Sequence, residues 1–246
     1  MISDRFETLA QAFRVFAEQH LRFRQLFLID APEAVGNLDH AIDGILNAFH
    51  GLYDAVKLEA PEAFNFYDDP LCAFVLRLRN ARHHNQANGL RSVYRRARAE
   101  EHPRDYLLIN FEAGESEDGG SFAEHYVSWS DIRAILDLQS AKYADSVAAG
   151  REAIAADRFE DWCLAHSYEV DRMFANLIPI LSAACSRCTG AISQYIEPES
   201  VEAEAFLNIF QNVEPADFDR QEYVELTSAV FWCIEKVHIS SLTQLT

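Results

Sequence analysis

Several features that would decide the class of this protein at once are missing from its sequence. There is no run of about 20 consecutive apolar residues, so the sequence predicts no membrane span. The residues after Met1 alternate charged with apolar side chains and do not resemble a signal peptide. The five cysteines are an odd number without a disulfide framework, which indicates a reducing compartment. We therefore expect a cytoplasmic protein.

The commonest catalytic signatures are also absent. The sequence holds no H-E-x-x-H motif, no glycine-rich phosphate loop and no G-x-S-x-G turn. One C-x-x-C pair, Cys185 and Cys188, lacks the second pair or nearby histidine that a zinc site needs. We expect these cysteines to be buried in a helix, and we expect the protein to use neither a metal nor a cofactor.

Basic residues are scarce and unevenly placed. The net charge of −18 argues against general nucleic-acid binding, because phosphate contacts need local cations. The segment from Arg77 to Arg104 nevertheless contains eight arginines and only two glutamates. Such a segment inside an acidic chain can bind phosphate, or it can be a solvated helix face that pairs with acidic neighbours.

The composition favours helices packed on aromatic side chains, since phenylalanine is common (17) and glycine is rare (9). Apolar residues recur at helical spacing over 4–28, which predicts a first amphipathic helix. A second apolar stripe runs from Leu38 to Val56. We expect Ala31-Pro32 and Gly36-Asn37 to interrupt the chain between the two helices.

A third helix is predicted to begin at Asp69-Pro70, where an acidic N-cap precedes a proline at the first helical position. Asn88-Gly89 is a stop signal for it. Further helices are expected over 131–142, 145–166, 168–196, 200–211 and 217–241.

Between these helical regions, residues 105–129 are rich in aromatic and branched side chains around a glycine-rich polar turn, which predicts a β-hairpin. The sequence thus predicts an all-α helical bundle with one inserted hairpin. We divide it into a helical region over 1–103, a hairpin insert over 104–130, and a carboxyl-terminal helical region over 131–246 that packs on the first.

The third helix ends in the hexapeptide Arg79-Asn80-Ala81-Arg82-His83-His84. An arginine supplies a permanent cation for phosphate, and a histidine can take up or release a proton near neutral pH. These are the groups that RNA cleavage without a metal requires.

An arginine, then a polar residue that is often asparagine, then three residues and a histidine is the signature of the HEPN superfamily, and Arg79, Asn80 and His84 match it. On the basis of this motif and of the order of helices over residues 1–100, the chain resembles these helical toxins and phage-defence ribonucleases. The resemblance implies a HEPN-like bundle and a metal-independent endoribonuclease that acts on RNA. It also implies a homodimer whose two motifs face one cleft, and a possible antitoxin or regulatory partner.

The resemblance also implies roles for the motif residues. His84 would act as general base or acid, Arg79 would bind the phosphate, and Asn80 would orient one of them. In a regular helix, Arg79 and His84 point about 140° apart, so we expect a two-fold interface to bring both copies of 77–84 together. Further RNA contacts are expected from Arg77, Arg82, His83, Arg91 and Arg95.

Other interpretations remain open. The protein can be a non-catalytic helical module that docks a partner or nucleic acid through the Arg77–Arg104 segment, or a helical small-molecule sensor. The arginines and histidines can also simply complement the dipole at a helix carboxyl end. His50, one turn from apolar residues in the second helix, is expected to be packed or partly exposed.

Overall fold

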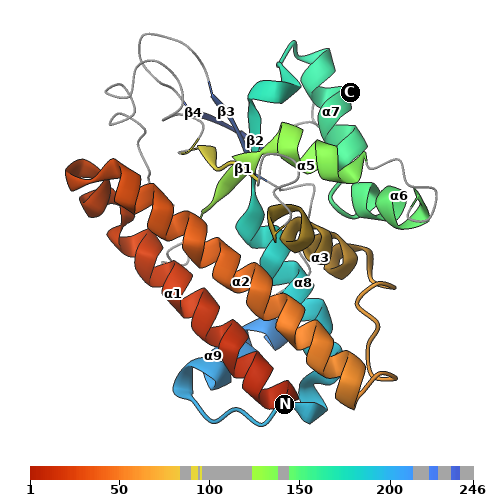
Figure 1. The fold of residues 1–246 in the computed structure, drawn as a ribbon. Coiled ribbons are helices and arrows are strands. Elements are labelled where there is room, and N and C mark those ends of the chain that lie inside the picture. Colours follow the sequence, from red (N-terminus) through yellow and green to blue (C-terminus); the bar gives the residue numbers. More distant parts are fainter. Residues whose placement is uncertain are drawn as a thin grey trace.

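The computed structural model describes residues 1–83, 90–93, 95, 124–137, 144–212, 222–226 and 234–238. Within these ranges the chain is mostly helical and carries one small antiparallel sheet (Figure 1). The predicted helical class is confirmed in this coarse form. No helix in the described ranges is long and apolar enough to cross a membrane.

Two long helices, α1 (Ile2–Ile29) and α2 (Ala31–Glu59), lie side by side and antiparallel along their whole length (Figure 1). Asp30 joins them and caps α2, because its carboxylate accepts a hydrogen bond of 3.0 Å from the backbone N–H of Glu33. Pro32 lies in the first turn of α2, where a helix does not need its missing N–H.

The predicted interruption between the first two helices is present but lies at Asp30, and its extension to Gly36-Asn37 is wrong. Ala31-Pro32 begins α2, and Gly36-Asn37 lies inside it. A glycine inside a helix costs about 1 kcal/mol relative to alanine. The neighbouring Val35 and Leu38 are both buried against α1 and the core. Burial of such side chains is worth about 1.5–3 kcal/mol each, which outweighs the cost of the glycine.

Helix α3 (Pro70–His83) lies at the centre of the molecule, in contact with α2 and with three later helices. Its start is as predicted: the Asp69 carboxylate accepts hydrogen bonds from the backbone N–H groups of Leu71 (3.0 Å) and Cys72 (2.9 Å). All side chains from Leu71 to Leu76 are buried. The last two turns of α3 reach the surface, so the motif lies where this central helix becomes exposed to solvent.

Three shorter helices follow, α5 (Trp129–Leu136), α6 (Ala144–Ala153) and α7 (Ala156–Ala165). The helix predicted over 145–166 is wrong as a single element. It breaks at Ala155, whose backbone is left-handed with a φ of 51°. The apolar periodicity of the sequence continues across this break, because Ile154 before it and Ala156 after it are both buried.

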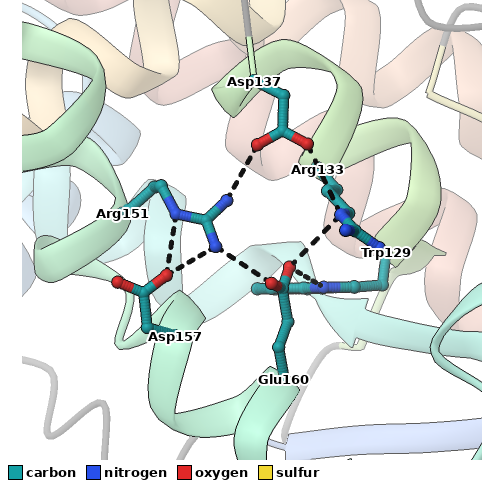
Figure 2. Close-up of polar contacts among 6 residues, drawn as sticks. All are labelled: Trp129, Arg133, Asp137, Arg151, Asp157 and Glu160. Carbon is teal, nitrogen blue, oxygen red and sulfur yellow. Dashed lines mark hydrogen bonds and ion pairs between the residues drawn. The ribbon is translucent and has the colours of Figure 1, made fainter. Parts of the chain in front are cut away.

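A network of ion pairs joins these three helices (Figure 2). The Arg151 guanidinium on α6 donates to Asp137, Asp157 and Glu160 at distances of 3.0, 2.5 and 2.9 Å. Glu160 on α7 also accepts a hydrogen bond of 3.1 Å from the indole N–H of Trp129 on α5. Each of the three guanidinium nitrogens of Arg151 thus donates to a carboxylate inside the fold, so Arg151 holds these helices together.

The carboxyl-terminal part packs back on the first helices. The 3₁₀ turn η4 (Val170–Arg172) leads into strand β2 (Met173–Asn176) and then helix α8 (Leu177–Ile192), which contacts α3. After η5 (Ser193–Tyr195), helix α9 (Val201–Asn212) lies against α1. The helix predicted over 200–211 is therefore confirmed.

Aromatic rings form the contact between α9 and α1, with Phe210 meeting Phe6 and Phe13 at centroid distances of 6.4 and 5.3 Å. This is the aromatic packing between helices that the composition predicts.

The sheet has the strand order β1-β2-β3-β4 and is antiparallel throughout. Strand β1 (Tyr126–Ser128) pairs with β2, so that Val127 faces Ala175. Strand β3 (Glu222–Leu226) pairs with the other edge of β2, and β4 (Ile234–His238) pairs with β3.

These strands correct two helix predictions. Residues 168–196 are not one helix, because 173–176 form β2 and α8 begins only at Leu177, just before Pro179. All four residues of β2 are buried, and a short fully buried strand shows no alternation that would distinguish it from a helix. The helix predicted over 217–241 is also wrong, since β3 and β4 lie there, where β3 pairs with β2 and β4 pairs with β3.

The predicted hairpin is described only at its second strand. Tyr126–Ser128 is a strand, but its described partners are β2 and an isolated bridge between Val127 and Ser92. The expected first strand over 106–111 lies outside the described residues.

Candidate functional site

A pocket of about 370 Å³ opens between α2 and the end of α3, and we call it the Arg79 pocket. Both helices contribute residues spaced three or four apart, so each helix presents one face to it. Three of its residues, His40, Asn47 and His83, are exposed to solvent. The lining consists of His40, Asp43, Leu46, Asn47, Arg79, Arg82 and His83.

Arg79 is held in this pocket by two amide oxygens. Its Nε donates to Asn47 Oδ1 and a terminal nitrogen donates to Asn80 Oδ1, both at 3.2 Å. An amide orients a guanidinium without cancelling its charge, whereas a carboxylate would cancel it. No carboxylate of the described ranges forms an ion pair with Arg79, which keeps its full positive charge at the mouth of the pocket.

Arg82 lies one turn away and is bound quite differently. Its Nε forms an ion pair with Asp43, and a terminal nitrogen donates to the backbone carbonyl of Asp39 at 3.3 Å. The other terminal nitrogen donates to the Leu90 carbonyl at 3.4 Å. The Arg82 side chain is only 9% exposed. It ties α3 to α2 and lines the Arg79 pocket, but its charge is largely matched by Asp43.

His50 is partly exposed, as predicted, with 25% of its side chain accessible to solvent. It lies three residues after Asn47 on α2, and its Nδ1 is 3.2 Å from a carboxylate oxygen of Asp54. Burial lowers the pKa of His50, and the nearby charges of Arg79 and His83 lower it further, while Asp54 raises it. His50 is therefore within the electrostatic field of Arg79. The signal in the sequence was the spacing of four between His50 and Asp54.

The other residues predicted to act on RNA lie in different environments. Arg91 lies outside the Arg79 pocket, since its guanidinium donates to both carboxylate oxygens of the buried Asp131 at 2.8 and 3.0 Å. Arg95 is exposed, and its charge partly opposes the burial that raises the pKa of the Asp39 carboxyl. Arg77 is half-buried on α3. His84 lies outside the described residues, so the structure brings together Arg79, Asn80, Arg82 and His83 only.

Behind the pocket lies a buried polar layer. His125 is fully buried, and its Nε2 is 3.8 Å from Asp39 Oδ1, too far for a hydrogen bond. Burial, with smaller contributions from Arg82 and His20, lowers the pKa of His125 to about 3. Burial also raises the pKa of Asp39. Neutral His125 therefore adds no charge to this layer, and burial disfavours the charged form of Asp39.

The two cysteines of the C-x-x-C pair are free and fully buried in α8, as predicted. Burial raises the pKa of Cys188 to about 12 and that of Cys185 well above its ordinary value, so neither is a ready thiolate. Among the residues described, no three His, Cys, Asp or Glu side chains are placed to hold a metal ion.

The fold and the pocket thus define a mostly helical protein with a cationic pocket beside its central helix. Comparison of the chain with protein-family models, with curated proteins and with solved structures gave no match.

Proposed function

We propose that this chain is a HEPN-like, metal-independent endoribonuclease, and that the Arg79 pocket binds the scissile phosphate. The observation that carries the proposal is the way Arg79 is held, by the amides of Asn47 and Asn80, with its charge left for an anion. The order of elements supports it as well, because two long antiparallel helices precede the helix that carries the motif.

The chemistry needs two proton transfers. The ribose 2′-oxygen attacks the adjacent phosphorus and loses its proton to a base, while the bond from phosphorus to the 5′-oxygen breaks and that oxygen receives a proton from an acid. The products are a 2′,3′-cyclic phosphate and a 5′-hydroxyl. Arg79 stabilises the charge that grows on the phosphate oxygens.

We assign one proton transfer to His84, on the basis of the motif. His50 is suited to the other, because Asp54 engages its Nδ1 and leaves Nε2 for the substrate. A second copy of the chain can supply the same group instead, if the two copies of residues 77–84 meet in a homodimer as the resemblance implies.

The test is cleavage of total RNA by the purified protein in EDTA, with analysis of the ends. We expect cyclic phosphates, and we expect Arg79→Ala and His84→Ala each to lower the rate by about 10²-fold or more. Arg24→Ala, which removes an exposed arginine from α1, is the matched control. Unchanged melting temperatures exclude misfolding. Wild-type cleavage rates in both motif variants would refute the proposal.

A second candidate is a non-catalytic module that docks an acidic partner or nucleic acid. It is favoured by the net charge of −18, because a free ribonuclease benefits from electrostatic attraction to its substrate. Absence of cleavage, together with salt-sensitive binding that Arg79→Ala weakens, selects this candidate. A toxin or phage-defence role, with an antitoxin as partner, belongs to the first candidate.

A further inference from the structure

A second pocket, of about 390 Å³, lies farther along α2, and we call it the aromatic pocket. Its volume is within the ~300–1,000 Å³ usual for small-ligand sites. It is formed where the end of α2 meets the segment that leads to α3. The lining consists of Tyr53, Lys57, Pro61, Phe64, Asn65, Phe66 and Tyr67.

The rings of this pocket brace one another. Phe66 is 1% exposed and forms the floor, where Tyr53 and Phe64 meet it at centroid distances of 5.6 and 5.0 Å. Tyr67 stands perpendicular to Tyr53, at 5.5 Å and 89°, and is 45% exposed. The backbone N–H of Tyr67 donates to Asn65 Oδ1 at 3.1 Å, which fixes the turn. The pocket is thus a rigid set of aromatic faces open to solvent.

Lys57 adds one positive charge at this site. Its ammonium lies 5.7 Å from the centre of the Tyr53 ring. An aromatic pocket without a cation would suit a quaternary ammonium, but here the lysine already occupies that position and would repel a second cation. Aromatic faces beside a single ammonium suit instead a flat ring attached to an anion.

The aromatic pocket lies farther along α2 than the Arg79 pocket, and His50 lies between the two on this helix. Asn47 touches Arg79, His50 follows it, and the His50 ring meets the Tyr53 ring edge-on at 5.6 Å. Asn47 and Tyr53 are six residues apart, or about 9 Å along the helix axis. An oligonucleotide that binds Arg79 through a phosphate can therefore extend along α2 toward Tyr53 and Tyr67.

We propose that the aromatic pocket is a nucleobase subsite, which receives an unpaired base next to the phosphate held by Arg79, while Lys57 contacts a neighbouring phosphate. The inference rests on the proposed function and deepens it: the substrate is single-stranded RNA or a loop, because a paired base cannot enter a pocket. Stacking on aromatic side chains tolerates every base, so sequence preference at this position is weak.

The experiment measures binding of a short single-stranded oligoribonucleotide with 2′-O-methyl groups, which cannot be cleaved, by fluorescence anisotropy. Tyr67→Ala should weaken binding by about 5- to 150-fold, the range for one stacked base. Tyr67→Phe should bind like the wild type. Lys57→Ala should weaken binding and reduce its salt dependence by about one counterion. Leu58→Ala, an exposed neighbour outside the pocket, is the control.

The outcomes separate this inference from the nuclease proposal. If RNA is cleaved but Tyr67→Ala changes neither oligonucleotide affinity nor KM, the subsite is wrong and the nuclease stands. If the oligonucleotide binds through Tyr67 but no RNA is cleaved, the nuclease is wrong and the subsite stands. A duplex of the same sequence that binds as tightly as the single strand overturns the subsite, and so does the absence of any oligonucleotide binding.

Discussion

Acid should destabilise this protein through one buried histidine, and the effect can be worked out from the structure. His125 is fully buried beside Phe16, and its pKa falls from 6.5 in the unfolded chain to about 3 in the fold. Below pH 6.5 the His125 side chain is therefore protonated in the unfolded state, whereas in the folded state it stays neutral until the pH approaches about 3. The stabilising contribution of neutral His125 is complete above pH 6.5 and is lost as the pH falls toward 3.

Each pH unit in this window costs about 1.4 kcal/mol of unfolding free energy. Between pH 7 and pH 5 the loss is about 2 kcal/mol from His125 alone. Because pH 5 lies above the folded pKa, the loss is fixed by the unfolded pKa. The groups around His125 are Arg82 and His20, which disfavour its protonation, and Asp39, whose own pKa is raised by burial.

The assay is urea denaturation of the wild type and of His125→Leu at both pH values. The leucine cannot titrate, so the wild type should lose about 2 kcal/mol more than the variant on going from pH 7 to pH 5. His20 has a pKa lowered by burial and contributes to both proteins alike, which is why the difference between them is measured. His40→Gln, at an exposed site, serves as control. Equal losses in wild type and His125→Leu would refute the reasoning.

Two further predictions concern arginines that the fold engages. Arg91→Ala should destabilise the protein by about 3–5 kcal/mol in urea denaturation, because Asp131, 2% exposed, would lose the partner of its buried charge. A loss below about 1 kcal/mol would contradict this role. Arg151→Gln should cost about 1–3 kcal/mol by leaving Glu160 short of its donor, whereas Asp157→Asn, at a 74% exposed side chain, should change stability by less than about 1 kcal/mol. Equal effects of these two substitutions would show that the network does not depend on Arg151.

Much of the helical framework could be predicted because long amphipathic helices repeat their signal over many turns. The stripe of α2 and the Asp69 cap of α3 are both of this kind, and both are confirmed. The errors fall where the decisive interaction is non-local. Strand β2 has four buried residues and no alternation, and its pairing partners are distant in the sequence. The break at Ala155 leaves no trace in the apolar pattern.

The candidate site likewise combines local features, which the sequence predicts, with non-local ones, which it does not. The hexapeptide itself is local, and three of its residues, Arg79, Arg82 and His83, line one pocket. The sequence does not predict which arginine is available to a ligand, because the carboxylates that pair with the other arginines lie on helices distant in the sequence. Asp43 is 39 residues from Arg82, and Asp131 is 40 residues from Arg91. No periodicity in the sequence relates residues at such separations.

The strongly negative net charge is therefore a poor guide to what this protein binds. The charge that an arginine offers to a ligand depends on whether its hydrogen-bond partner inside the fold is a carboxylate or an amide. Arg82, Arg91 and Arg151 each form ion pairs with carboxylates, and their charge stabilises contacts within the fold. Arg79 meets two amides, so that its charge faces the pocket while its geometry is fixed. In the proposed function, the net charge of −18 adds selectivity, because it disfavours phosphate binding away from an arginine whose charge no carboxylate offsets.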